Sequence, residues 1–199
     1  LLAADLAEVV AYAQARAGIA AAPHVVGHSF GGLVVQEAIA SGRLRPTSLV
    51  LMCTGRGALP GQRAAELAPL IAALDEHDLA TIWQIMRDME EAEDAVRPAP
   101  EVMDFLERRW HANSPAQLRA FATMLMTQAP LTERVAAVAA DLPMTVMWGE
   151  RDDAWPVADQ AAMAQALGAA AVELPGLGHS PNAEDPRATT AALLRAWRP

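Results

Sequence analysis

The sequence contains no lysine and a single cysteine, and its charge balance is strongly acidic. Against its 15 arginines stand 24 Asp and Glu residues, which gives a formal net charge of -9 at pH 7. Binding to phosphate needs clustered Lys and Arg, so this balance argues against nucleic acid and against an anionic membrane surface as partners. The lone cysteine, Cys53, excludes an internal disulfide and fits a reducing compartment, so we expect a cytoplasmic protein.

Long apolar runs and metal-ligand patterns are also missing. No run approaches the roughly 18–20 apolar residues that a membrane span requires. The five histidines do not pair at ligand spacing on one helix, so we expect no metal and no cofactor. The chain has 199 residues, of which 53% are hydrophobic, enough to bury a sizeable core in what we expect to be one domain.

The expected helices and strands alternate along most of the chain. Short apolar runs predict buried strands at 24–28, 47–54, 144–149 and 170–176, the first of them rich in valine. Apolar residues at three- and four-residue spacing predict helices at 2–17, 31–42, 67–75, 78–91, 101–110, 115–127, 157–167 and 186–197. This order indicates an α/β fold with a parallel sheet covered on both faces.

No strand pattern occurs between residues 56 and 140. We interpret this segment as a helical cap inserted between two parts of the core, 1–55 and 141–199. Within the segment, "RPAPE" at 97–101 breaks the helical pattern, and the acidic run at 90–94 is typical of a solvated helix end.

The chain begins in the middle of a helical pattern and without a Met. We therefore expect that a segment of roughly 60–80 residues precedes Leu1, judged from the size of typical α/β domains. Without such a segment the strand at 24–28 would present an open apolar edge, and we expect this chain alone to be poorly stable or inactive.

The stretch "GHSFG" at 27–31 is a G-x-S-x-G motif placed where a strand turns into a helix. In that context the sharp turn makes the Ser29 hydroxyl project from the top of the sheet. The helix that follows offers free N–H groups and a positive dipole end, which suit a developing oxyanion. The backbone N–H of Phe30, next after the serine, is the first expected oxyanion donor.

A serine nucleophile needs a base, and the base needs an orienting carboxylate. Asp152 lies just beyond the strand at 144–149, and His179 lies on a Gly-rich loop after the last strand. Both positions fall at the carboxyl ends of parallel strands, the edge where Ser29 also lies. Asp153 is an alternative acid, although the G-x-x-D spacing from Gly149 favours Asp152.

The segments "VVGHSFGG", "WGERDDAWP" and "LPGLGHSPNAEDP" resemble the nucleophile, acid and histidine segments of the α/β-hydrolase superfamily, in particular its capped serine hydrolases. The resemblance covers nearly the whole chain, and the cap is generic. It implies a partial α/β-hydrolase fold with Ser29 as nucleophile, Asp152 as acid and His179 as base. The strands that precede the nucleophile in this family, with the loop that carries a second oxyanion donor, are not in this sequence.

The remaining candidate residues each have a simpler interpretation. His28 is expected to pack near the pocket, His24 to lie on the surface, and His77 and His111 to be ordinary helix residues. Cys53 is expected to behave as a small buried apolar residue. Three cap residues are candidates for an apolar substrate pocket, although their helical spacing favours a role in the core of the cap: Trp83, Trp110 and Met124.

The function that the resemblance implies is hydrolysis of a small carboxylic ester or lactone through an acyl-enzyme, with no cofactor. The same three residues also serve cofactor-free haloperoxidases and hydroxynitrile lyases, but the lyases need a pocket lysine that this sequence lacks. A non-catalytic ligand-binding module, or an inactive fragment of a hydrolase, is the alternative outside catalysis.

Overall fold

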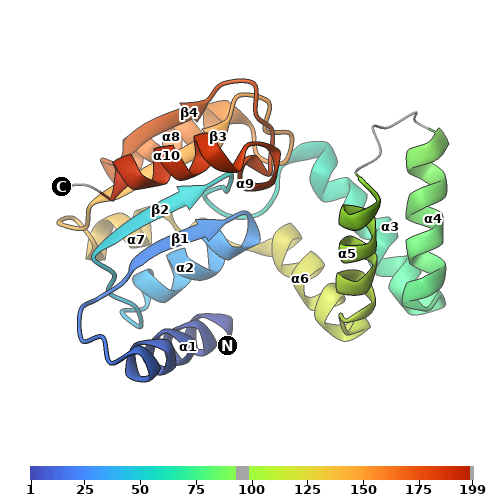
Figure 1. Ribbon diagram of the computed structural model, residues 1–199, viewed down its shortest axis with the longest axis horizontal. Helices are drawn as coiled ribbons and strands as arrows, with labels where there is room; N and C mark the ends of the chain where they lie inside the picture. Colours follow the sequence, from blue (N-terminus) through green and yellow to red (C-terminus); the bar gives the residue numbers. More distant parts are fainter. Residues whose placement is uncertain (93–98, 198–199) are drawn as a thin grey trace. The chain divides into compact units, whose positions relative to one another are not determined.

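The computed structural model describes residues 1–92 and 99–197, and the side chains of 90–92 are left out of the description (Figure 1). These residues form two compact units. The first unit comprises Leu1–Leu59 with Gln128–Pro199, and the second comprises Pro60–Thr127. The expected helix break at 97–101 and the acidic run at 90–94 both extend outside the described residues.

The first unit is built on a four-stranded sheet whose strands lie side by side in chain order and are all parallel. The strands are β1 (His24–His28), β2 (Ser48–Met52), β3 (Met144–Gly149) and β4 (Ala170–Leu174). The expected α/β class with a parallel sheet is therefore confirmed. Among the described residues β1 pairs on one side only, with β2, so it forms an edge of the sheet.

Two strands end earlier than the sequence pattern indicates, because the backbone leaves the extended conformation. Cys53 has a φ of 48°, which ends β2 at Met52 although the apolar run continues to 54. Gly176 has a φ of 70°, and β4 ends before it at Leu174. Both turns lie at the edge of the sheet where the candidate site forms.

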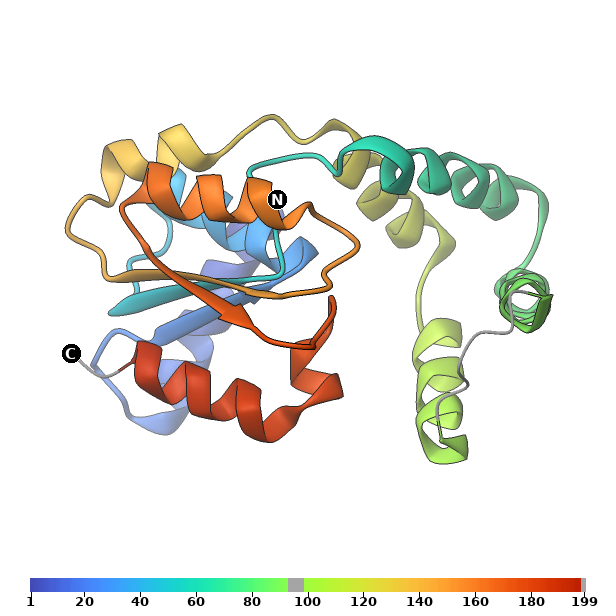
Figure 2. The ribbon, with the colours of Figure 1, turned by 90° about the horizontal axis from the view of Figure 1, so that it is seen from above.

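Helices cover both faces of this sheet (Figure 2). One face packs against α2 (Phe30–Ala40), α7 (Thr132–Val138) and α8 (Val157–Leu167), and α1 (Leu2–Ala17) packs against α2. The other face packs against α10 (Pro186–Ala196), which the short helix α9 (Pro181–Glu184) precedes. Each face of the sheet has its own hydrophobic core, and the fully buried strand β2 contributes to both because its side chains alternate between the faces. Leu49 and Leu51 belong to the core under α2, and Val50 and Met52 belong to the core under α10.

The second unit is entirely helical in its described residues. It contains α3 (Gly61–Glu76), α4 (Leu79–Ala92), α5 (Pro100–His111) and α6 (Pro115–Thr127). Contacts between α3 and α6 and between α4 and α5 hold these helices together. This unit, called the helical insert below, is shorter than the expected cap of 56–140, because α7 packs against α2 and α8 in the first unit.

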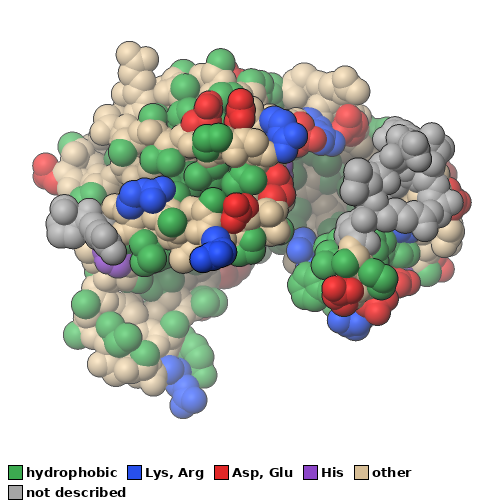
Figure 3. Space-filling model, turned by 45° about the horizontal axis from the view of Figure 1, so that its top comes forward, with side chains coloured by type: hydrophobic (Ala, Val, Ile, Leu, Met, Phe, Trp, Pro, Cys, Tyr) green, Lys and Arg blue, Asp and Glu red, His purple; other side chains and the backbone are tan. Residues whose placement is uncertain are grey.

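The surface carries charges of both signs. Figure 3 shows arginine and acidic side chains interspersed with apolar ones over the face that it displays. No helix among the described residues is both long enough and apolar enough to cross a membrane.

Candidate active site

Four loops meet at the carboxyl edge of the parallel sheet, one after each strand. Ser29 follows β1, Cys53 and Thr54 follow β2, Asp152 lies three residues after β3, and His179 lies five residues after β4. Since ligand sites of open α/β sheets form outside the carboxyl ends of the strands, this edge is the candidate active site.

Ser29 occupies a sharp turn between β1 and α2. Its backbone angles, φ 53° and ψ -127°, lie in a region that residues with a side chain rarely adopt. The turn is held by the sheet, because the Ser29 N–H donates to the Met52 carbonyl at 3.0 Å. A strained backbone of this kind costs about 1–3 kcal/mol and persists only where its surroundings fix it.

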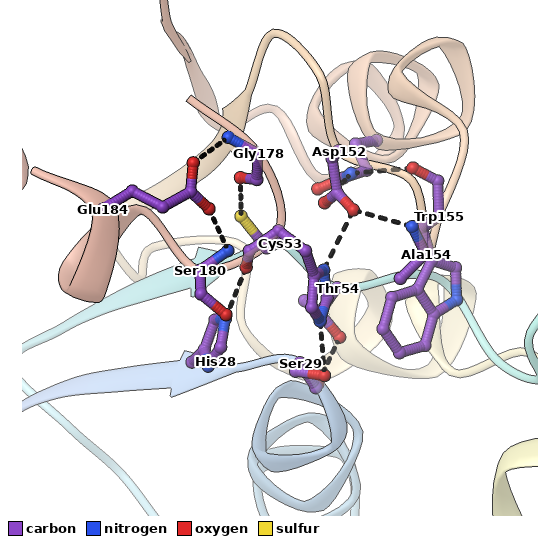
Figure 4. Close-up of polar contacts among 12 residues, drawn as sticks. His28, Ser29, Cys53, Thr54, Asp152, Ala154, Trp155, Gly178, Ser180 and Glu184 are labelled. Atoms are coloured by element: carbon purple, nitrogen blue, oxygen red, sulfur yellow. Dashed lines mark hydrogen bonds and ion pairs between the residues drawn. The ribbon is translucent and has the colours of Figure 1, made fainter. Parts of the chain in front are cut away.

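Thr54 also fixes the Ser29 turn, from the neighbouring strand end (Figure 4). Its hydroxyl donates to the Ser29 carbonyl at 2.8 Å, and the side chain is fully buried. Gly32 makes room for it, since a Cβ at position 32 would lie only 2.5 Å from the Oγ1 of Thr54. The glycine in the first turn of α2 is therefore required by the threonine that supports the serine.

The imidazole of His179 lies between the serine and the aspartate. Its Nε2 is 2.9 Å from the Ser29 Oγ, and its Nδ1 is 2.9 Å from the Asp152 Oδ1. Because a carboxylate only accepts hydrogen bonds, Nδ1–H donates to Asp152 and Nε2 is left to accept the proton of the Ser29 hydroxyl. This is the arrangement of a nucleophile, a general base and an orienting acid.

Asp152 is held as an anion by three donors. Its side chain has no exposed surface, and besides His179 it accepts hydrogen bonds from the Ala154 N–H at 3.0 Å and from the Gln160 amide at 2.8 Å. Burial raises the pKa of the Asp152 carboxyl, but the hydrogen bonds from His179, Ala154 and Gln160 together bring the pKa below its ordinary value. Asp153, the alternative acid, is exposed.

The loop that carries His179 approaches β3 very closely. A Cβ at Gly149 would overlap the carbonyl oxygens of Leu177 and Gly178. The glycine at the end of β3 therefore lets the histidine loop pass next to the aspartate loop, which brings His179 within reach of Asp152.

His28 contacts the histidine loop from the end of β1. Its Nε2 donates to the carbonyl of His179 at 2.8 Å, and the centroids of the two imidazole rings are 5.3 Å apart. Burial is the main cause that lowers the pKa of His28, and the nearby His179 ring adds to it. Because a neutral His28 does not repel a positive charge, the His179 ring next to it can take up a proton.

Cys53 is buried beside these two histidines and completes a group of three potential metal ligands. The ligand atoms of His28, Cys53 and His179 lie within 4.8 Å of one another. Helix spacing could not reveal this group, because the three residues lie at or after the ends of three different strands. Burial raises the pKa of the Cys53 thiol to about 12, and its Sγ donates to the Gly178 carbonyl at 3.8 Å. All three groups already serve hydrogen bonds within the site, so the set fits a hydrogen-bonded network better than a metal centre.

The other three histidines lie away from this group. His24 is exposed, with its Nδ1 2.7 Å from the Ser48 Oγ. His77 and His111 are exposed residues of the helical insert. Phe30, whose N–H is the expected oxyanion donor, is the first residue of α2.

Two of the three predicted pocket residues meet within the helical insert. The ring centroids of Trp83 and Trp110 are 6.3 Å apart, and the Trp110 indole donates to the Leu79 carbonyl at 2.7 Å. Both tryptophans line a groove between helices of the insert, together with the apolar residues Met86, Leu106, Leu118 and Phe121 and the polar residues Arg87, Arg109 and Asn113. Met124, on α6, is half-buried and does not belong to the residues that line this groove.

Three supporting residues were not singled out from the sequence: Thr54, Gln160 and Glu184. Each acts through a hydrogen bond to a neighbouring loop: Thr54 to the serine turn, Gln160 to the aspartate and Glu184 to the histidine loop. Their residue types are common, and only the spatial order of the loops brings them to the site.

The fold and the geometry together define an α/β protein with a serine at a strand-to-helix turn. The chain belongs to the alpha/beta hydrolase family, whose sequence pattern matches residues 2–193. The expected family is thereby confirmed, and with it the assignment of the protein to a family of enzymes. Comparison with curated protein sequences gives no match.

Solved structures of the same fold include proteins of different activities. An esterase from Thermogutta terrifontis is 21% identical, with a TM-score of 0.72 over 97% of this chain and 71% of that one. A candidate non-heme bromoperoxidase from Mycobacterium tuberculosis is 22% identical, with a TM-score of 0.71 over 98% and 72%. The enol-lactonase from Burkholderia xenovorans is 20% identical, with a TM-score of 0.70 over 96% and 71%. At these identities the likeness shows the fold alone.

Proposed function

We propose that the protein is a serine hydrolase that cleaves small carboxylic esters or lactones through an acyl-enzyme. The observation that carries this proposal is the position of the His179 ring, 2.9 Å from the Ser29 Oγ on one side and 2.9 Å from the Asp152 Oδ1 on the other. Membership of the alpha/beta hydrolase family supports hydrolysis as the reaction class.

Acylation begins at Ser29. As its Oγ attacks the substrate carbonyl carbon, the hydroxyl proton passes to Nε2 of His179, and Asp152 stabilises the resulting imidazolium. The negative charge that develops on the carbonyl oxygen is stabilised at the N-terminus of α2, with the N–H of Phe30 as one donor. The tetrahedral intermediate then expels the alcohol, which takes its proton from Nε2 of His179.

Deacylation repeats these steps with water as the nucleophile. His179 removes a proton from the water, which attacks the acyl carbon, and the proton returns to Ser29 as the ester bond to the enzyme breaks. The scheme uses side chains of this chain and water, without a metal or cofactor. In a lactone the leaving alcohol stays attached to the acyl group, so that ring opening gives one product, a hydroxy acid.

Three residues of the helical insert stay candidates for contacts with a hydrophobic acyl or alcohol group: Trp83, Trp110 and Met124. The two tryptophans line a groove of the insert that combines aromatic and aliphatic side chains with two arginines, Arg87 and Arg109. An esterase and an enol-lactonase share the fold, which supports both kinds of carboxylic ester.

Cofactor-free peroxidation is a second candidate, favoured by the fold shared with the candidate bromoperoxidase. It would use the same serine: a carboxylic acid acylates the Ser29 Oγ with release of water, and hydrogen peroxide then takes the acyl group to give a peracid and the free serine. A hydroxynitrile lyase remains disfavoured, because the sequence has no lysine.

The test is a comparison of the protein with its Ser29→Ala variant on p-nitrophenyl esters of increasing acyl length and on a set of simple lactones. We expect hydrolysis by the parent chain and a loss of about 10⁴-fold or more in the variant. Bromination that requires peroxide, with no ester or lactone hydrolysis, would favour the second candidate instead. Equal rates for both chains would contradict a role for Ser29.

A further inference from the structure

The backbone on both sides of His179 is bound by a single carboxylate. The N–H of Gly178 donates to Oε2 of Glu184 at 2.6 Å, and the N–H of Ser180 donates to Oε1 of the same residue at 2.9 Å (Figure 4). Glu184 is the last residue of α9, and its own N–H donates to the Ser180 carbonyl at 3.0 Å. The glutamate thus closes a small ring around the residue that carries the imidazole.

The carbonyl groups of Gly178 and His179 accept hydrogen bonds from two other parts of the first unit. His28 donates to the His179 carbonyl at 2.8 Å, and Cys53 donates to the Gly178 carbonyl at 3.8 Å. Figure 4 places Glu184 on the side of Gly178 that faces away from Asp152. The backbone around His179 is therefore held by two donors, His28 at the end of β1 and Cys53 just after β2, and by the Glu184 carboxylate of α9 as acceptor.

The position of this backbone sets both distances on which the proposed chemistry depends. The ring must remain near Ser29 and Asp152 at once, so a shift of the His179 backbone lengthens at least one of the two hydrogen bonds. Hydrogen bonds to a charged acceptor are roughly twice as strong as neutral ones, which makes a carboxylate an effective anchor. Glycine at 178 fits this contact, since a Cβ there would lie 3.1 Å from the Oε1 of Glu184.

We propose that Glu184 is a positioning residue, which holds the backbone of His179 so that its imidazole stays aligned with Ser29 and Asp152. The inference rests on the proposed function for its catalytic consequence, but the alignment itself can be measured without a substrate. Glu184 does not contact the reacting atoms and acts only through the histidine loop.

The test compares Glu184→Gln with Glu150→Gln. A glutamine at 184 offers one acceptor oxygen for the two N–H groups and carries no charge. Glu150 provides the matched control, because its carboxylate accepts the Gly176 N–H at 2.7 Å in the same loop but does not bind a residue next to His179. Rates are divided by the number of sites labelled with a fluorophosphonate, so that unfolded protein does not count.

We expect kcat of Glu184→Gln on p-nitrophenyl acetate to fall by about 10- to 100-fold with KM little changed, the size of loss that a misplaced catalytic group causes. Glu150→Gln should keep most of its kcat. Equal kcat per labelled site in Glu184→Gln and the parent, or equal losses in the two variants, would overturn the inference.

A second readout is independent of activity. The low-field proton NMR signal of the His179 Nδ1–H reports its hydrogen bond to Asp152, and we expect it to weaken or broaden in Glu184→Gln and to persist in Glu150→Gln. If the parent chain showed no hydrolysis, the proposed function would be wrong. The NMR comparison of the two variants would still test whether Glu184 positions His179. A signal unchanged in Glu184→Gln would overturn that role.

Discussion

The hydroxyl of Thr54 donates a hydrogen bond of 2.8 Å to the carbonyl of Ser29, across the gap between the ends of two neighbouring strands. The serine lies in a strained turn, and the threonine that holds it is fully buried. The geometry of the proposed nucleophile is therefore set by the second strand as much as by its own motif.

Replacement of Thr54 by valine keeps the side-chain shape and removes this donor. The Ser29 carbonyl loses one of its two donors and keeps the N–H of Gly32 at 2.9 Å, so we expect a loss of about 0.5–1.5 kcal/mol in the free energy of unfolding, together with a lower kcat. Urea unfolding and ester hydrolysis measure the two effects.

Thr132 offers a matched control for that substitution. It is also fully buried, but its hydroxyl has no hydrogen-bond partner in the part of the chain that the structure describes. Thr132→Val should therefore leave stability unchanged or raise it, because no hydrogen bond is broken and a buried polar group is removed. If both variants lost equal stability, the Thr54 hydrogen bond would not be the cause.

The two adjacent glycines of α2 should respond differently to alanine. A Cβ at Gly32 would lie 2.5 Å from atoms of the buried Thr54, whereas a Cβ at Gly31 would meet nothing within 4 Å. We expect Gly32→Ala to destabilise the protein by about 1–3 kcal/mol or more, as overpacking does. Gly31→Ala should be neutral or stabilising by up to about 1 kcal/mol, because alanine favours a helix. The measurement is thermal unfolding of the two variants, and equal melting temperatures would contradict the close packing of Gly32 against Thr54.

The lowered pKa of the Asp152 carboxyl should make the stability of the fold depend on pH. Its pKa in the folded protein is below the ordinary value of 3.8, so its contribution to stability is present above that pH and is lost as the pH falls through the lowered pKa. The parent should exceed Asp152→Asn by about 1–3 kcal/mol near neutral pH, and the difference should shrink below about pH 4. Urea unfolding across this range measures the gap, and a gap that does not change with pH would refute the assignment.

The lowered pKa of His28 should also make the stability of the fold depend on pH, with the same sign as for Asp152 but in a higher pH range. Burial lowers its pKa from the ordinary value of 6.5, so as the pH falls below that value the unfolded chain binds a proton that the folded chain does not. Stability should therefore decrease between about pH 7 and about pH 5, and less so in His28→Gln. Glutamine keeps a donor for the His179 carbonyl without a titrating ring. If the free energy of unfolding fell by the same amount in the parent and in His28→Gln between about pH 7 and about pH 5, the result would contradict the lowered pKa of His28.

Much of the fold could be predicted because the decisive signals are local. The four strands are short apolar runs, and Ser29, Asp152 and His179 each follow one of them in the chain. Parallel pairing then brings the three residues to one edge without any knowledge of side-chain contacts. The choice of Asp152 over Asp153 also had a local basis, the spacing from Gly149.

The supporting contacts could not be predicted, because they depend on loops that meet only in the folded chain. Glu184 looks like an ordinary residue of a helix start, and Gln160 like one of several polar residues on α8. The extent of the insert was also overestimated, since α7 has no strand pattern and reveals its place only by packing against α2 and α8. The catalytic roles of Ser29, Asp152 and His179 remain predictions, as does the cytoplasmic location. The same holds for the oxyanion role of Phe30 and for the substrate contacts of Trp83, Trp110 and Met124.

The most direct test of the proposed chemistry is labelling with a fluorophosphonate, read by intact mass on the parent chain and on Ser29→Ala. A serine activated by His179 forms a covalent phosphonyl adduct, and an ordinary serine does not. The account predicts a single adduct on the parent and none on the variant. An adduct on both proteins, or none on a folded parent chain, would contradict the claim that Ser29, His179 and Asp152 form an assembled nucleophilic site.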